Sequence, residues 1–443
     1  MNQVSRANRK HWFPRDAPIP SYYALMKAFL SLLFALLIAI ILTACAPGDA
    51  PTATVTPSPS EPQPSVTVQP ATPEPVELTL WLPDWMALEE SAGHEALMAM
   101  VTIFEKEQGV RVTIVPKRPR GPGGLLDWLQ KTQPVAPSLL PDIIALPFQD
   151  IPAAARADLL QPLSPLFPED LQGDLYPFAQ EASMADEAWM SLPFAADFEH
   201  LAFQPAALSE PPATWDVILT SNVPYLFPYG GAESAWTDAI ILHYLSATPN
   251  GEDPVRNRKA LRSLLEFYEA AYRGGLVDPM GAQITHPKDA WESALQGSAP
   301  LAETTASLWL AQQGQAAFLR FGPTPTRDGK GRYLMHGWAY AIVTADETRQ
   351  NLAVQLISDL MATDSLARWS YQAHVLPARR TSLMQWPAND FHNFAFEAME
   401  KGFLQPAFTQ DKEMARSVHQ AVLAVLTGQM TAKEAWDQAV AGW

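Results

Sequence analysis

The chain has 443 residues, 48% of them hydrophobic, so it is long enough to bury a large core or two lobes. Its formal net charge is −17, and residues 1–44 hold five of its basic residues and one acid, so the remainder is more acidic still. An acidic surface repels phosphate backbones, which argues against a nucleic-acid partner. Cys45 is the single cysteine, so no internal disulfide forms.

Residues 1–44 are predicted to be an N-terminal extension followed by a lipoprotein signal peptide. An apolar run of 17 residues, 28–44, follows Lys27 and ends directly before Cys45. A spanning helix needs about 20 residues, and the basic flank and small terminal residues fit a secretory signal better. The sequence LTAC at 42–45 resembles the bacterial lipobox, which implies cleavage before Cys45 and lipidation of its thiol. A plain, uncleaved membrane anchor is the alternative.

Residues 45–75 are predicted to be the lipidated cysteine and a disordered tether. Positions 46–75 contain nine prolines and eight serines or threonines, with almost no large apolar side chains. Such a segment buries too little surface to fold and is expected to be extended. At ~3.1 Å per residue it would hold a domain up to roughly 90 Å from its anchor.

The folded part is predicted to begin near Val76 with a strand, a helix and a second strand. Residues 76–82 alternate apolar and other side chains, as do 110–115. Between them, apolar residues at 97, 100, 101 and 104 form one helical face that Gly109 would close. This order indicates a βαβ unit in a parallel sheet, and 141–146 adds a buried strand.

The second half is predicted to be mainly helical. Helical spacing of apolar residues runs over 261–272, where Gly274 and Gly275 stop it, and over 352–360. Thr431 with Glu434 forms a capping-box pattern that would open the last helix. The fold class is therefore α/β.

Signatures of catalysis and of metal or cofactor binding are missing from the sequence. The nine histidines are scattered, and there is no HExxH, CxxC, GxGxxG, P-loop or GxSxG pattern. We therefore predict no enzymatic activity, no catalytic residues, no metal and no cofactor. A catalytic triad dispersed along the chain is left open, because its members need not be close in sequence.

Several stretches resemble, in order, the bacterial extracellular solute-binding proteins of carbohydrate ABC importers, the group that contains maltose-binding protein. They are FEKEQGVRV at 104–112, PDII at 141–144 with ADLLQPL at 157–163, SLPFAAD at 191–197, PATWD at 212–216, GWAYAI at 337–342, VLPARR at 375–380 and LTGQMTAKEA at 426–435. Two stretches depart from the family pattern: FQPAA at 203–207, and the region near Pro83, which lacks the usual polar group. These departures bear on the identity of the ligand more than on the fold.

The resemblance implies a two-lobed periplasmic-binding-protein-like fold of type II, hinged, with the ligand in the cleft between the lobes. It places the solute-binding domain at 76–443. Lobe one is expected at about 76–195 and 322–377, and lobe two at about 200–318 and 378–443. Two lobes that close on a hinge bury a ligand from both sides, and a transporter can recognise the closed form.

A sugar presents polar hydroxyls and apolar C–H faces, so its site needs aromatic platforms together with directional donors and acceptors. The first candidates follow predicted strands, at whose carboxyl ends α/β sheets bind ligands. The others lie where the resemblance implies contacts, at the lobe crossing, in loops of lobe two and at an aromatic platform after Gly337. The candidate ligand-binding residues are Asp84, Trp85, Phe148, Gln149, Asp197, Tyr229, Trp236, Glu303, Trp309 and Trp338. For each of them a core, surface or capping role is the alternative.

Together with the lipobox-like motif, the resemblance leads us to expect a lipid-anchored, monomeric receptor at the outer face of the cytoplasmic membrane. Its partners would be a small polar solute, expected to be a sugar, and the permease subunits of an ABC importer. A polyol, a polyamine or a sugar phosphate is the alternative solute. A tethered surface hydrolase or adhesion module is the alternative function.

Overall fold

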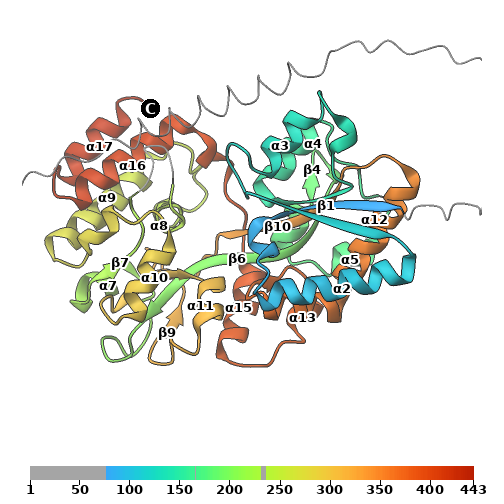
Figure 1. Ribbon diagram of the computed structural model, residues 1–443. Coiled ribbons are helices and arrows are strands. Elements are labelled where there is room, and N and C mark those ends of the chain that lie inside the picture. The colour runs from blue at the N-terminus through green and yellow to red at the C-terminus, as the bar shows by residue number, and fades with distance from the viewer. Residues whose placement is uncertain (1–75, 165, 231–235) are drawn as a thin grey trace, which may run out of the picture. The chain divides into compact units, whose positions relative to one another are not determined.

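The computed structural model describes residues 76–164, 166–230 and 236–443 (Figure 1). The expected signal peptide at 1–44, the lipidation site Cys45 and the tether up to residue 75 lie outside the described residues. Within the described ranges, no helix combines the length and the apolar character needed to cross a membrane.

The described strands form a mixed sheet of nine strands in the order β2-β1-β3-β10-β6-β8-β7, with β9 and β11 also paired to β6. The strands are β1 (Glu77–Pro83), β2 (Arg111–Lys117), β3 (Ile143–Pro147), β6 (Leu192–Phe203), β7 (Tyr225–Leu226), β8 (Leu301–Thr305), β9 (Arg320–Gly322), β10 (Met335–Ile342) and β11 (Leu376–Pro377). A separate two-stranded ribbon pairs β4 (Met184–Ala185) with β5 (Ala188–Trp189).

The predicted βαβ unit is confirmed. Strand β1 pairs in parallel with β2 and with β3, and helix α2 (Ala92–Gln108) connects β1 to β2. Ser91 caps α2 by accepting a hydrogen bond from the His94 N–H at 3.1 Å. Gly109 ends the helix with a φ of 66°, a left-handed conformation that costs glycine little. The apolar face of α2 is buried, as its spacing predicted.

Strand β6 is shared by two groups of strands, and this defines the two lobes. Its residues 192–198 pair with β10 and β11, beside β3, β1 and β2. Its residues 199–203 pair with β8 and β9, beside β7. We call the first group with its helices the first lobe and the second group with its helices the second lobe. The chain crosses between them at residues 198–199.

Helices cover the strands in both lobes (Figure 1). The first lobe contains α2, α3 (Leu125–Thr132), α4 (Ile151–Arg156), α5 (Glu169–Gly173), α6 (Pro177–Ala182), α12 (Glu347–Met361), α13 (Thr363–Gln372) and α14 (Arg380–Leu383). The second lobe contains α7 (Trp215–Ser221), α8 (Asp238–Ala247), α9 (Arg258–Arg273), α10 (Pro287–Leu295), α11 (Ala306–Gln312), α16 (Lys412–Leu426) and α17 (Ala432–Val440). Helix α15 (Asp390–Lys401) packs against α6 of the first lobe and against Trp309 and Phe321 of the second.

Short 3-10 turns join several of these elements. They are η1 (Asp84–Ala87), η2 (Pro137–Leu139), η3 (Phe148–Asp150), η4 (Pro279–Ala282) and η5 (Ala407–Gln410). The predicted helices at 261–272 and 352–360 are confirmed as parts of α9 and α12, and Thr431 with Glu434 forms the predicted capping box of α17. One expectation about local structure differs: α11 begins at Ala306, so Trp309 lies on a helix rather than in a loop. Thr305 starts this helix by accepting a hydrogen bond from the Leu308 N–H.

Candidate functional site

A cleft of about 760 Å³ lies where the two lobes meet. The first lobe contributes loop and strand residues, β6 contributes the crossing segment, and the second lobe contributes the start of α8 and nearby loops. The lining residues are Arg120, Gln149, Asp197, Phe198, Glu199, Pro228, Gly230, Trp236, Thr237, Asp238, Thr285, His286, Pro287, Thr305, His336 and Gln405. The volume is in the range that holds a small organic ligand.

Asp197 stands at the crossing point and is held by hydrogen bonds within the protein. Its Oδ1 accepts bonds from the Ser307 N–H at 3.0 Å and the Phe198 N–H at 2.9 Å, and its Oδ2 accepts one from the Ser307 hydroxyl at 2.5 Å. Burial raises the pKa of Asp197 above its usual value, and these bonds oppose the rise. Asp197 therefore ties β6 to the start of α11 while it also lines the cleft.

Glu199 lies two residues further along β6, on the same face as Asp197. It is 7% exposed, and its Oε2 has no hydrogen-bond partner among the described residues. Burial and the nearby charges of Asp238, Glu303 and Asp197 raise the pKa of Glu199 well above its usual value, against a backbone hydrogen bond from Ala239. The cleft therefore contains a buried carboxyl group with an unused oxygen.

His336 and Asp238 form a contact across the cleft. The His336 Nε2 on β10 lies 2.5 Å from the Asp238 Oδ2 at the start of α8. Burial lowers the pKa of His336, but the charge and hydrogen bond of Asp238 outweigh burial, so the pKa is raised overall. Arg120 also lies close enough to Asp150 and Asp238 to feel their charges. These pairs link the lobes electrostatically.

Trp236 supplies an aromatic wall in the second lobe. Its ring is half-buried, 5.4 Å from Tyr244 and 5.5 Å from Phe408, and its Nε1 has no partner among the described residues. An indole ring beside a polar cleft offers the flat apolar face that a sugar needs.

A second aromatic group lies in the first lobe, on β10 and the turn after β1. Trp338 follows His336 by two residues on β10, so both side chains leave the same face of the strand. Trp338 and Trp85 are half-buried, with ring centroids 6.0 Å apart in an edge-to-face arrangement. Asp84, the residue before Trp85, is exposed. These three predicted residues lie outside the cleft lining itself.

Four other predicted residues are buried in the core. Phe148 packs against Gly337 on the face of β10 opposite Trp338. Tyr229 is fully buried and donates a hydrogen bond to the Asp278 carbonyl at 3.1 Å. Glu303 accepts bonds from the hydroxyls of Tyr225 and Thr324.

Trp309 is the fourth, and its ring stacks on Phe391 with 5.7 Å between centroids. Of the ten predicted residues, Gln149, Asp197 and Trp236 therefore come together in the cleft lining.

The sequence interpretation missed the charged residues that face one another in the cleft, Arg120, Glu199, Asp238 and His336. A signal for two of them was present. Glu199 is two positions from Asp197, and His336 two positions from Trp338, so the alternation of a strand puts each on the face of a predicted residue. Asp238 had no comparable signal, because the position of α8 across the cleft depends on the fold.

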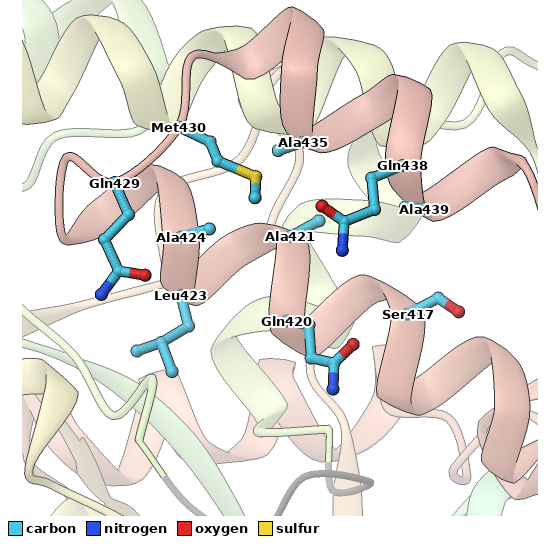
Figure 2. Close-up of a pocket in the computed structure, with 10 residues that line it drawn as sticks. All are labelled: Ser417, Gln420, Ala421, Leu423, Ala424, Gln429, Met430, Ala435, Gln438 and Ala439. Carbon is cyan, nitrogen blue, oxygen red and sulfur yellow. The ribbon is translucent and has the colours of Figure 1, made fainter.

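Figure 2 shows a second hollow, of about 430 Å³, between α16 and α17. Uncharged residues line it, among them the amides of Gln420, Gln429 and Gln438. It belongs to one lobe, so closure of the lobes would not enclose a ligand there.

In the part of the chain that the structure describes, no group of three or more His, Cys, Asp or Glu residues is arranged to hold a metal ion.

Comparisons with known proteins agree with this architecture. The family model of bacterial extracellular solute-binding proteins matches residues 99–395, and the chain belongs to this family. Among solved structures, maltose-bound T. maritima MalE3 has a TM-score of 0.62 at 17% identity, over 83% of this chain and 98% of that chain. The cyclic alpha-maltosyl-1,6-maltose binding protein from Arthrobacter globiformis has a TM-score of 0.62 at 16% identity, over 83% and 97%.

The predicted two-lobed α/β fold is thereby confirmed. The family is one of extracellular binding proteins, in agreement with an extracytoplasmic location. No curated protein matches the chain.

Proposed function

We propose that this protein captures a sugar in the cleft between its lobes and delivers it to the permease of an ABC importer. The observation that carries the proposal is the composition of the cleft, which joins charged and polar groups of both lobes to the indole of Trp236. Directional polar groups beside a flat aromatic ring fit a molecule with hydroxyl edges and apolar faces. Of the two similar structures, one is a maltose-bound protein and the other is a cyclic alpha-maltosyl-1,6-maltose binding protein.

The lobe boundaries belong to this proposal. We place the first crossing at 198–199, where β6 changes its pairing partners, between the expected end of lobe one at about 195 and the expected start of lobe two at about 200. We propose that the chain passes back into lobe two at a point later than residue 378. Arg379 forms an ion pair with Asp174 at 2.7 Å, and Arg380 pairs with Glu400 of α15. We therefore draw it between α15 and α16, after residue 401.

The proposed function is tested by melting the purified protein with a panel of sugars. A bound ligand stabilises the folded state by mass action, by about 2.7 kcal/mol at a hundredfold excess over the dissociation constant. We expect one class of sugar to raise the melting temperature and to be recovered chemically unchanged. Sugars that leave the melting temperature unaltered, or that are recovered as hydrolysis products, would contradict a transport receptor.

Lipid anchoring through Cys45 is part of the proposed function and needs its own test. We expect Cys45→Ser to move the protein from the membrane fraction to the soluble fraction, because the variant lacks the thiol that would carry the lipid. Ser65→Ala, in the same proline-rich segment, is the control and should stay in the membrane fraction. Membrane retention of Cys45→Ser would indicate an uncleaved anchor instead.

A further inference from the structure

Glu199 has an unpartnered carboxyl oxygen. The side chain is more than nine-tenths buried and lines the cleft, yet its Oε2 has no hydrogen-bond partner among the described residues. Leaving a buried polar atom without a partner costs about 1–3 kcal/mol, and more when the group is charged. Such a group at a binding site is expected to find its partner in the ligand.

The neighbouring acids already have partners within the protein. Asp197 accepts three hydrogen bonds from Ser307 and Phe198. Asp238 pairs with His336 across the cleft, and Glu303 accepts hydrogen bonds from the hydroxyls of Tyr225 and Thr324. Glu199 thus differs from the acids around it, because its buried Oε2 has no hydrogen-bond partner among the described residues.

The charge around Glu199 favours a donor that is positively charged. Asp197, Asp238 and Glu303 all lie close enough to act on its ionisation, and each makes a negative charge on Glu199 less favourable. A ligand cation at this point would offset that repulsion, whereas a neutral hydroxyl would not. The two basic side chains that line the cleft already interact with acids of the protein. Arg120 lies near Asp150 and Asp238, and His336 pairs with Asp238. Trp236 in the same lining adds an aromatic face that attracts cations.

We propose that the ligand is an amino sugar with a free amine, and that its ammonium group donates a hydrogen bond to Glu199. The inference rests on the proposed function, because it assumes a carbohydrate in the cleft. An ammonium group has three donors, so it can reach Glu199 and a second acceptor of the lining at once. Because burial and neighbouring acids raise the pKa of unliganded Glu199, the arriving cation also favours release of its proton.

The test uses matched sugars that differ in one substituent. Glucose, glucosamine and N-acetylglucosamine are titrated into the purified protein, together with the neutral, amine and N-acetyl forms of α- and β-linked disaccharides and with spermidine. We expect an amine form to bind at least about tenfold more tightly than its neutral and acetylated counterparts, the range of a charge-assisted hydrogen bond.

Variants of Glu199 separate this contact from the rest of the site. Glu199→Gln, which has the shape of a protonated Glu199, should lose the preference for the amine, and Glu199→Asp should keep part of it. The control Glu266→Gln, on the exposed face of α9, should bind like the parent. Melting of each unliganded variant checks that it is folded.

The outcomes distinguish the two proposals. Equal binding of neutral and amine sugars, or an amine preference that survives Glu199→Gln, would overturn the inference and leave the carbohydrate function standing. Binding of spermidine alone, lost in Glu199→Gln, would overturn the carbohydrate function and the amino-sugar assignment while keeping the ammonium contact. Absence of binding by every compound would contradict both.

Discussion

His336 on β10 and Asp238 at the start of α8 meet across the cleft, with 2.5 Å between Nε2 and Oδ2. One residue belongs to each lobe, so the pair contributes to the arrangement in which the lobes are close. Its charge depends on the protonation of His336, whose pKa is raised by Asp238 despite burial.

We expect His336→Gln to weaken lobe closure, because the variant keeps a hydrogen-bonding side chain but loses the positive charge. The raised pKa means that the contribution of the pair to stability is fully present below the unfolded pKa of histidine, about 6.5. That contribution is lost as pH rises through the folded pKa. His336 is partly exposed, so the effect on the free energy of unfolding should be no more than about 1 kcal/mol.

The measurement is small-angle X-ray scattering of parent and His336→Gln at about pH 5 and pH 8. The variant should have a larger radius of gyration at the lower pH and match the parent at the higher one. His374→Gln, at an exposed position, is the control. Identical scattering of parent and His336→Gln at both pH values would remove the pair from the closing contacts.

Glu303 gives a pH dependence of stability with a defined sign. Burial raises the pKa of Glu303 to about 7, against the hydrogen bonds from Tyr225 and Thr324. Because its pKa is raised on folding, Glu303 stays protonated in the folded state over a pH range in which it is ionised in the unfolded chain. Stability is then lost as pH rises from about 4.5 to 7, by about 3 kcal/mol in total.

Glu303→Gln removes this ionisation. The free energy of unfolding of the variant, minus that of the parent, should increase by about 3 kcal/mol between pH 4 and pH 8, as measured by denaturant titration. Subtracting the free energy of unfolding of the parent removes the contributions of other titrating groups. Among them are His200 and His243, whose lowered pKa values make stability rise with pH. A difference that is constant with pH would show that Glu303 ionises normally.

Trp236 and Trp309 should respond differently to substitution, although the sequence made both of them candidates. Trp236 lines the cleft, so Trp236→Ala should weaken sugar binding by about tenfold while the unliganded protein stays folded. Trp309 is 6% exposed and packed on Phe391, so Trp309→Phe should lower stability by about 1–3 kcal/mol and leave the affinity unchanged. Calorimetric titration and thermal melting of both variants check this. An affinity loss confined to Trp309→Phe would reverse the assignment.

Gly337 is required for close packing between β10 and β6. A side-chain carbon at this position would collide with the Ala195 carbonyl and with the ring of Phe148. We therefore expect Gly337→Ala to lower the free energy of unfolding by about 1–3 kcal/mol. Gly314→Ala is the matched control, since the space around Gly314 is open. Equal stabilities of the two variants would contradict the packing argument.

The sequence predicted the elements of the fold better than the members of the site. The periodicity of β1, α2 and β2 and the caps at Gly109 and Thr431 are local signals, and the structure confirms them. Whether an aromatic residue faces the cleft or the core depends on the direction of its side chain after folding. Phe148 and Gln149 are adjacent in one loop, yet Phe148 packs in the core and Gln149 lines the cleft.

The position of Asp238 depends on contacts between segments that are distant in the sequence. It reaches His336 because α8 begins opposite β10, at a separation of 98 residues along the chain. Such a contact has no local pattern, so reasoning from the sequence found the aromatic candidates and missed the ion pair. Alternation along β6 and β10, applied to the charged neighbours of Asp197 and Trp338, would have added Glu199 and His336.

Titration calorimetry of cleft and control variants tests most directly whether one solute binds between the lobes. With the sugar found in the melting screen, the parent should bind roughly one molecule per chain. Trp236→Ala should lose most of this affinity, while Gln438→Ala, in the hollow between α16 and α17, should keep it. Binding that survives Trp236→Ala and disappears in Gln438→Ala would place the solute between α16 and α17 and would contradict binding in the cleft.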